Sequence, residues 1–300
     1  MAKVIVVFGA TGLQGGGVVT ALLKNKNFEV RGVTRNAKSD KAKALETQGV
    51  KVAEGNLYDP KSLSNVLSGC YGVFGVTNFW EHMDANKDIQ QGKNLVDACK
   101  AAGVKHLIFS GLEEVKGKLG KPCHHFDARA EIEKYMFASG VPSTSARYCF
   151  YFEKFLDFVK ESAQKDDKGS FVIGIPMEGK PLYLGSATGS GNAVAAMFAS
   201  PGPYIGKAVG LAGDLKTVDE CMDIFNKHLA PKTFKASEIT AEQFSQFPFP
   251  AAADLGAMCQ FLQLGVMERD LELTKQLDPS TLNFEDWVKA NIDALNAAYQ

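Results

Sequence analysis

The sequence predicts an α/β protein built on a Rossmann-type, doubly wound parallel sheet with a smaller, mostly helical second lobe. Three observations predict this fold. Short apolar runs alternate with helical segments through the first half, a glycine pattern joins the first run to the first helix, and the alternation is lost in the second half. Neighbouring parallel strands need crossover connections, which the intervening helices supply.

Six apolar runs in the first half are short and rich in β-branched or aromatic residues. They predict strands over residues 3–8, 28–34, 50–55, 71–77, 105–111 and 142–148. Residues 13–23 predict the first helix. The clearest helix is expected from Asp84 to Ala102, because apolar residues and Cys99 recur on one face and Gly103 ends it.

The second half has a different pattern. Residues 170–176 and 208–213 predict isolated strands, set among helices near residues 190–200, 216–229, 240–247, 251–264 and 283–298. We therefore expect a Rossmann domain over residues 1–155. Residues 156–300 are expected to form a smaller substrate- or partner-binding lobe that can contribute strands to the main sheet.

The composition is that of an ordinary globular chain of 300 residues, 45% of them hydrophobic and 22% charged. We recognise no signal peptide and no membrane-spanning run, and the six cysteines form no CxxC pair, so we expect a cytoplasmic protein with reduced thiols. The nucleus is a second expected location. The net charge of −1 does not favour direct nucleic-acid binding. The first 150 residues hold 20 Lys and Arg against 14 Asp and Glu, which suits a small polyanion.

A glycine loop follows the first expected strand and opens the first expected helix. Gly9 allows a sharp turn, Gly12 removes a Cβ where backbone would approach a pyrophosphate, and Gly15 lets the helix lie close to the strand. The amino terminus of the helix then offers free N–H groups to phosphate. The spacing is GxxGxxG, and its position between a strand and a helix favours a dinucleotide site.

The residues after the second strand indicate which dinucleotide is bound. NAD sites usually carry a carboxylate there for the ribose 2′-hydroxyl, whereas this chain has Arg35, Asn36 and Lys38. A guanidinium can grip a 2′-phosphate, so NADP(H) is the predicted cofactor. By topology, Asn56, Thr77–Asn78 and Ser110–Gly111 end neighbouring strands at the same crevice.

The motifs VVFGATGLQGGGV, VTRN, VTNFWE, SGLE, HFDARAEIEKY and YFEKFL resemble those of the NmrA-like family, an atypical branch of the short-chain dehydrogenase/reductases. Its animal NADPH-sensor members give the nearest match. The resemblance covers essentially the whole chain. It implies NADP(H) binding and a regulatory role that follows the NADPH/NADP ratio through conformation, oligomeric state and protein partners.

The resemblance also implies which residues contact the cofactor. They are Gly9, Thr11, Gly12, Leu13, Gln14, Arg35, Asn36, Asn56, Leu57, Thr77, Asn78, Phe79, Tyr151, Phe152 and Glu153. The chemistry of three further residues adds them to the expected cofactor contacts: Gly15, Lys38 and Arg129. Three positions depart from the family pattern: Arg129 and Gln90 each stand where relatives can carry Lys, and Gly185–Val194 lacks the Asp that usually begins a helix.

Hydride transfer to a carbonyl needs a proton donor, which in typical short-chain reductases is a Tyr with a Lys four residues later. No Tyr here has Lys at that spacing. Tyr151, Ser110 and Arg129 are the remaining catalytic candidates, although a guanidinium does not donate protons. Cys123, His124 and His125 lack a second ligand cluster at a recognisable spacing, so we expect no metal.

These residues support two hypotheses about function, from two different classes of protein. The first is an NADP(H)-binding regulator without efficient catalysis, read by protein partners and able to pair as a homodimer. The second is an NADPH-dependent reductase of a small quinone, enone or imine. The sequence favours the regulator because it lacks the Tyr and Lys pair.

Overall fold

The fold was analysed in a computed structural model, which describes residues 2–300. Seven parallel strands form the central sheet in the order β11-β6-β5-β4-β1-β2-β3. Their bounds are β1 (Lys3–Phe8), β2 (Phe28–Thr34), β3 (Lys51–Glu54), β4 (Gly72–Gly75), β5 (His106–Gly111), β6 (Ser143–Arg147) and β11 (Ala208–Gly210). The strand order reverses between β1 and β4, and ligands of such sheets bind outside the carboxyl ends at this point. The predicted Rossmann-type fold is confirmed.

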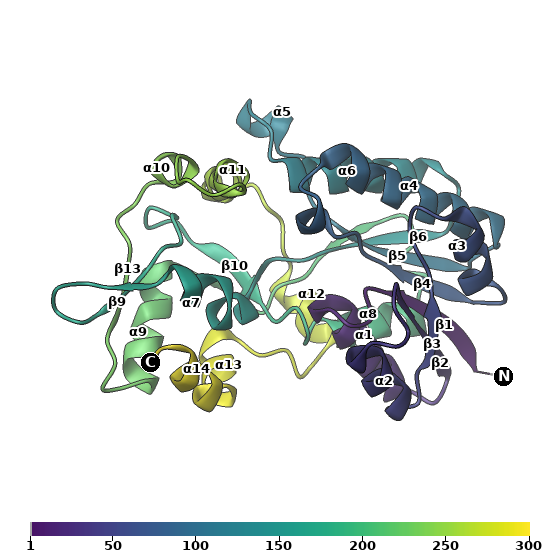
Figure 1. The fold of residues 1–300 in the computed structure, drawn as a ribbon, viewed down its shortest axis with the longest axis horizontal. Helices are drawn as coiled ribbons and strands as arrows, with labels where there is room; N and C mark the ends of the chain where they lie inside the picture. Colours follow the sequence, from purple (N-terminus) through teal and green to yellow (C-terminus); the bar gives the residue numbers. More distant parts are fainter. Residues whose placement is uncertain (1) are drawn as a thin grey trace.

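Helices cover both faces of the sheet (Figure 1). One face carries α3 (Pro60–Leu67), α4 (Ala85–Ala101) and α6 (His124–Ala138), and the other carries α1 (Leu13–Leu23), α2 (Asp40–Thr47), α8 (Gly191–Ala199) and α12 (Leu271–Leu277). Strand β1 alternates between them: Ile5 and Val7 belong to the core under α1 and α8, and Val6 to the core under α4 and α6. Burial on both faces explains why β1 is a continuous apolar run.

Helices α1 and α8 pack together through two glycines. A Cβ on Gly17 would lie 2.1 Å from the carbonyl oxygen of Thr188, and one on Gly191 would lie 2.2 Å from the backbone of Gly17. These distances are too short for any side chain. The segment Gly185–Val194 therefore supplies the close approach between the two helices.

The second lobe holds two small sheets and a set of helices. The sheets have the orders β12-β10-β7 and β13-β9-β8, from β7 (Phe150–Tyr151), β8 (Gln164–Lys165), β9 (Phe171–Ile173), β10 (Leu182–Gly185), β12 (Asp214–Lys216) and β13 (Phe234–Ala236). The helices are α7 (Phe158–Ser162), α9 (Val218–His228), α10 (Ala241–Ser245), α11 (Ala252–Gln263), α13 (Phe284–Ala290) and α14 (Ile292–Ala298). Because β11, α8 and α12 pack with the central sheet, the second half of the chain contributes to both regions.

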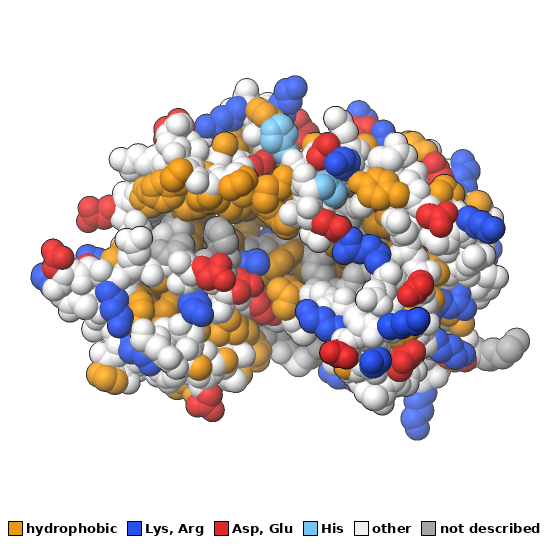
Figure 2. Space-filling view, viewed as in Figure 1, with side chains coloured by type: hydrophobic (Ala, Val, Ile, Leu, Met, Phe, Trp, Pro, Cys, Tyr) orange, Lys and Arg blue, Asp and Glu red, His pale blue; other side chains and the backbone are white. Residues whose placement is uncertain are grey.

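A hollow runs beneath α10 and α11, and hydrophobic side chains line its upper wall (Figure 2). It includes a cavity of about 500 Å³ bordered by Phe244, Phe247, Phe249 and Val172. Within the described residues, no helix is long and apolar enough to cross a bilayer.

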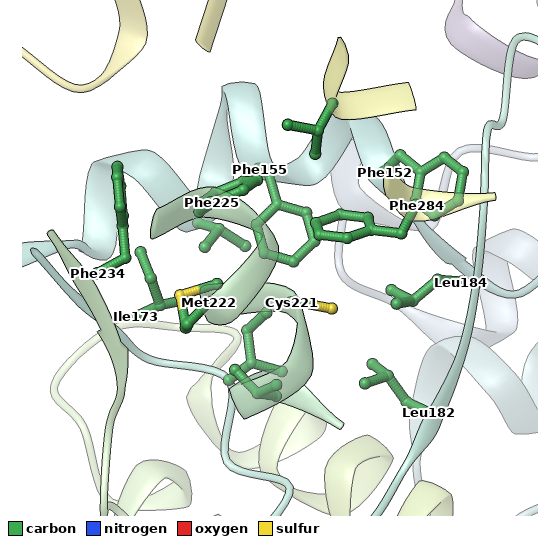
Figure 3. Packing of buried hydrophobic residues seen from close by; sticks show 14 of the residues in the cluster. Phe152, Phe155, Ile173, Leu182, Leu184, Cys221, Met222, Phe225, Phe234 and Phe284 are labelled. Atoms are coloured by element: carbon green, nitrogen blue, oxygen red, sulfur yellow. The ribbon is translucent and has the colours of Figure 1, made fainter. Parts of the chain in front are cut away.

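Aromatic rings build the core of the second lobe (Figure 3). Phe225 lies at its centre, with ring centroids 5.4 Å from Phe155, 5.1 Å from Phe234 and 5.6 Å from Phe284. The single helix expected near residues 283–298 is divided into α13 and α14 at Asn291. There the backbone leaves the helical conformation (φ −119°, ψ 20°), and the side-chain amide and the backbone N–H of Asn291 both donate to the carbonyl oxygen of Trp287 (2.8 and 3.1 Å).

Candidate functional site

The glycine loop between β1 and α1 has the geometry that its sequence predicts. Gly9 adopts a left-handed conformation (φ +64°), and a Cβ on it would lie 2.7 Å from Cγ1 of Val76. A Cβ on Gly15 would lie 2.2 Å from the carbonyl oxygen of Gly9. Only glycine therefore permits this turn and this close packing of the helix on the strand.

The amino terminus of α1 is open. Gly12 is its N-cap, no side chain caps it, and its first turn contains no acidic residue. A Cβ on Gly12 would approach only the carbonyl oxygen of Gly9, at 3.4 Å, and the side chain of Leu13 is 41% exposed. The exposed end of a helix with unused N–H groups is an anion-binding surface.

Arg35 follows β2 and is exposed at the mouth of the crevice. Its guanidinium forms an ion pair with Glu81, in the short 3-10 helix η1 (Phe79–Glu81) that follows β4. In the same loop, Oδ1 of Asn36 accepts a hydrogen bond from the backbone N–H of Lys38 (2.9 Å), and the Lys38 side chain is exposed. Sequence reasoning placed the basic residues here but missed the carboxylate of Glu81, although it lies in the VTNFWE motif.

Three predicted contacts lie at the ends of β3 and β4. Oδ1 of the exposed Asn56 accepts from the N–H of Tyr58 (3.0 Å), which forms a turn. The carbonyl oxygen of Leu57 accepts from the side chain of Asn94 (2.8 Å), and the exposed Asn78 begins η1. Loop geometry thus holds these residues at the crevice edge.

Arg129 ties the carboxyl ends of β4 and β5 together. It donates to the carbonyl oxygen of Thr77 (3.0 Å) and to the Ser110 hydroxyl (3.2 Å). The Thr77 hydroxyl donates in turn to the carboxylate of Asp88 (3.0 Å), a fully buried residue of α4. Arg129 is thereby held at the base of the crevice.

Asp88 is a buried acid that sequence reasoning missed. Burial raises its pKa, and the nearby charge of Arg129 and the hydrogen bond from Thr77 offset only part of that rise. The signal available in the sequence was an Asp at position 88, one helical turn before Gly92 and two before Leu95 on the buried face of α4. A polar residue on an apolar helix face needs a partner, and Thr77 provides it.

Tyr151 lies across the crevice from the glycine loop, where its hydroxyl accepts a hydrogen bond from the side chain of Gln14. Burial raises the pKa of Tyr151, so this phenol stays protonated at neutral pH. The neighbouring residues point elsewhere. Phe152 is fully buried in the core of the second lobe, and Glu153 accepts hydrogen bonds from Ser186 and from the N–H groups of Ala187 and Thr188.

Cys123, His125 and Asp254 lie close together, with candidate ligand atoms within 4.8 Å of one another. Asp254, from α11, joins the two residues at the start of α6 from a distant part of the sequence. Its carboxylate is engaged by the backbone N–H of His124 and by Nδ1 of His125. Burial raises the pKa of the Cys123 thiol. These bonds tie the second lobe to α6.

Comparisons with known proteins identify the family and the fold. The model of the NmrA-like family matches residues 1–288. The NmrA-like family domain-containing oxidoreductase lnaB of Aspergillus flavus is 28% identical, over 93% of this chain and 91% of its own. This relative is fungal, whereas the motifs favoured animal members.

Two solved structures share the fold. The negative transcriptional regulator NmrA, in complex with NADP, superimposes with a TM-score of 0.82 at 19% identity, covering 99% of this chain and 97% of its own. The NADPH-dependent quinone oxidoreductase QOR2 of Escherichia coli, complexed with NADPH, gives 0.78 at 23% identity, covering 96% and 99%. Since the family model spans nearly the entire chain, this protein belongs to the NmrA-like family.

Proposed function

We propose that this protein is an NADP(H)-binding regulator, whose conformation and protein contacts follow the NADPH/NADP ratio. The observation that carries the proposal is the open amino terminus of α1 behind a glycine turn, with the Arg35 guanidinium at the same crevice. The NADP complex of NmrA, a regulator with the same fold, supports it.

The residues present fit such a cofactor. Oε1 of Gln14 and Nε of Arg129 are buried and have no hydrogen-bond partner among the described residues, so each can serve a polar ligand atom. The loop Gly9–Gly15, with Thr11, would hold the pyrophosphate. Arg35 and Lys38 would hold the 2′-phosphate, and Asn36 would shape their loop.

The remaining predicted contacts would surround these groups. Asn56 and Leu57 would contact the adenine end, and Thr77, Asn78, Phe79, Arg129 and Tyr151 the nicotinamide end. Phe152 and Glu153 would contribute through their backbone alone, because their side chains are used in the core and in the loop before α8.

A cofactor-driven change at the crevice has a short route to the second lobe. The ring of Trp80 in η1 packs at a tilt against that of His125, with ring centroids 4.8 Å apart, and His125 bonds to Asp254 of α11. A ligand shifts a conformational equilibrium only through different affinities for the two states. The proposal therefore predicts that NADPH and NADP protect the amides of α11 from hydrogen exchange to different extents; equal protection would contradict the regulatory role.

A reductase of a small quinone, enone or imine is the second candidate. The similar fold of a quinone oxidoreductase favours this candidate. Tyr151 favours it too, because its hydroxyl accepts a hydrogen bond from Gln14 and keeps its own proton for donation. The experiment is to mix the protein with NADPH and a panel of these substrates and to follow the nicotinamide absorbance. Sustained turnover that Tyr151→Phe lowers would favour the reductase; its absence across the panel would favour the regulator.

Replacing Arg35 with alanine should weaken NADPH binding by roughly 30- to 150-fold, the cost of losing about 2–3 kcal/mol of charge-assisted hydrogen bonding. NADH binding should change far less, because NADH lacks the 2′-phosphate. Calorimetric titration of both dinucleotides measures the difference. Lys26→Ala, which removes an exposed charge before β2 and away from the crevice, is the control. Equal weakening of both ligands would show that Arg35 does not bind the 2′-phosphate.

A further inference from the structure

From the ion pair at the crevice mouth we infer that Glu81 competes for Arg35 and thereby sets the preference between dinucleotides with and without a 2′-phosphate. This inference rests on the proposed function, because it concerns the same cofactor site. Arg35 is the guanidinium proposed for the 2′-phosphate, and in this structure it is paired with Glu81 instead.

The two residues meet across the glycine loop. Arg35 follows β2 and Glu81 follows β4, and these strands flank β1 in the sheet. The ion pair therefore spans the carboxyl end of β1, where the ligands of such sheets bind. The Glu81 carboxylate already holds Nη1 of Arg35, so a phosphate that reached the guanidinium from this crevice would compete with it or bind beside it.

A fixed turn holds Glu81 in this position. The N–H of Glu81 donates to the carbonyl oxygen of Asn78 (3.2 Å), and that of Met83 donates to the carbonyl oxygen of Phe79 (2.7 Å). Phe79 is 3% exposed and packs edge-on against Trp80, with ring centroids 5.3 Å apart. The carboxylate is thus presented to Arg35 by an anchored element.

The ion pair is weak enough to be displaced. The side chain of Arg35 is 67% exposed and that of Glu81 is 41% exposed, so water and salt screen their attraction. Exposed ion pairs of this kind change an equilibrium by about 1.5- to 5-fold. A phosphate dianion is a stronger, charge-assisted partner for Arg35 than a carboxylate is. A Glu81 carboxylate that remains beside the bound phosphate repels the phosphate.

The test is Glu81→Gln, which keeps the size of the side chain and removes its charge. Adenosine 2′,5′-bisphosphate and NADPH should bind roughly 2- to 5-fold more tightly to this variant than to the wild type. ADP and NADH should change by less than about 2-fold, because neither carries the phosphate that Glu81 excludes. Calorimetric titration gives all four affinities, and the thermal midpoint of each variant confirms that it is folded.

Glu54→Gln is the matched control. Its carboxylate accepts from the N–H of Ala37 (3.0 Å), in the same loop as Arg35, without pairing with the guanidinium. If Glu54→Gln tightens the 2′-phosphate ligands equally, the effect is general charge repulsion and the inference is wrong. In an Arg35→Ala background, the effect of Glu81→Gln should largely disappear.

The remaining outcomes separate the two proposals. Unchanged or weaker binding of the 2′-phosphate ligands by Glu81→Gln, with Arg35→Ala still losing NADPH, would overturn the role of Glu81 alone. Failure of the wild type and every variant to bind any of the four ligands would overturn the proposed cofactor site, and the role of Glu81 with it.

Discussion

Replacing Arg269 with methionine should lower the free energy of unfolding by about 3–5 kcal/mol, since it leaves a buried carboxylate without its main partner. The Arg269 side chain is fully buried between α11 and α12, and both terminal nitrogens bind Glu113, just after β5. Nε and Nη2 also donate to the carbonyl oxygen of Tyr148, just after β6. The guanidinium thus holds the segment that follows α11 against the ends of two central strands.

Glu113 shows why the loss is large. Burial would raise its pKa, but the hydrogen bonds and charge of Arg269 outweigh burial and hold the pKa below its usual range. Without Arg269 the Glu113 carboxylate stays buried. The guanidinium of Arg147, 3.7 Å away, compensates for part of the lost attraction, so we expect a loss of stability toward the lower end of the range. Chemical denaturation at pH 7 measures the effect.

A second variant distinguishes loss of a partner from loss of packing. The double change Glu113→Gln/Arg269→Met removes both charges and should recover part of the stability, because an uncharged pair carries no ionic desolvation cost. Lys51→Met, at the exposed ion pair with Glu29, should have a far smaller effect. A loss below about 1 kcal/mol for Arg269→Met would show that the buried pair is not a stabilising anchor.

Local patterns explain how much of the fold could be predicted. The strands β1 to β6, together with α1 and α4, follow from apolar runs and caps that lie within a few residues of one another, such as Gly103 after α4. The pairing of β11 with β6 depends on residues more than 60 positions apart. The break between α13 and α14 falls at one asparagine, Asn291, whose backbone leaves the helical conformation.

The same distinction applies to the site. The glycine loop and Arg35 are local features, and the structure brings them to one crevice. The partners Glu81 and Asp254 were missed, because they contact Arg35 and His125 only after folding brings distant segments together. Family resemblance could assign Phe152 to the cofactor, but only packing shows that its side chain belongs to the core of the second lobe.

His106 should make the protein lose about 3 kcal/mol of stability between pH 6.5 and pH 4, because burial lowers the pKa of its imidazole to about 4. A histidine in the unfolded chain titrates near pH 6.5. Below that pH the unfolded chain binds a proton at this histidine, whereas the native protein does not. The contribution of His106 to the free energy of unfolding is therefore complete above pH 6.5 and declines by about 1.4 kcal/mol per pH unit as the pH falls.

The hydrogen bonds around His106 explain why its imidazole stays neutral in the native protein. The Thr144 hydroxyl gives its only proton to the carbonyl oxygen of Tyr204 (2.8 Å), so Nε2 of His106 must donate to Thr144 (2.8 Å). Nδ1 is then the atom to be protonated, and it is buried with no partner among the described residues. His106→Gln keeps a donor for Thr144 but does not titrate. Its unfolding free energy, measured by denaturation at each pH, should fall less steeply than that of the wild type between pH 6.5 and pH 4 and run parallel to it from pH 7 to pH 9. Equal slopes in the acid range would show that His106 takes up a proton in the native protein as readily as in the unfolded chain.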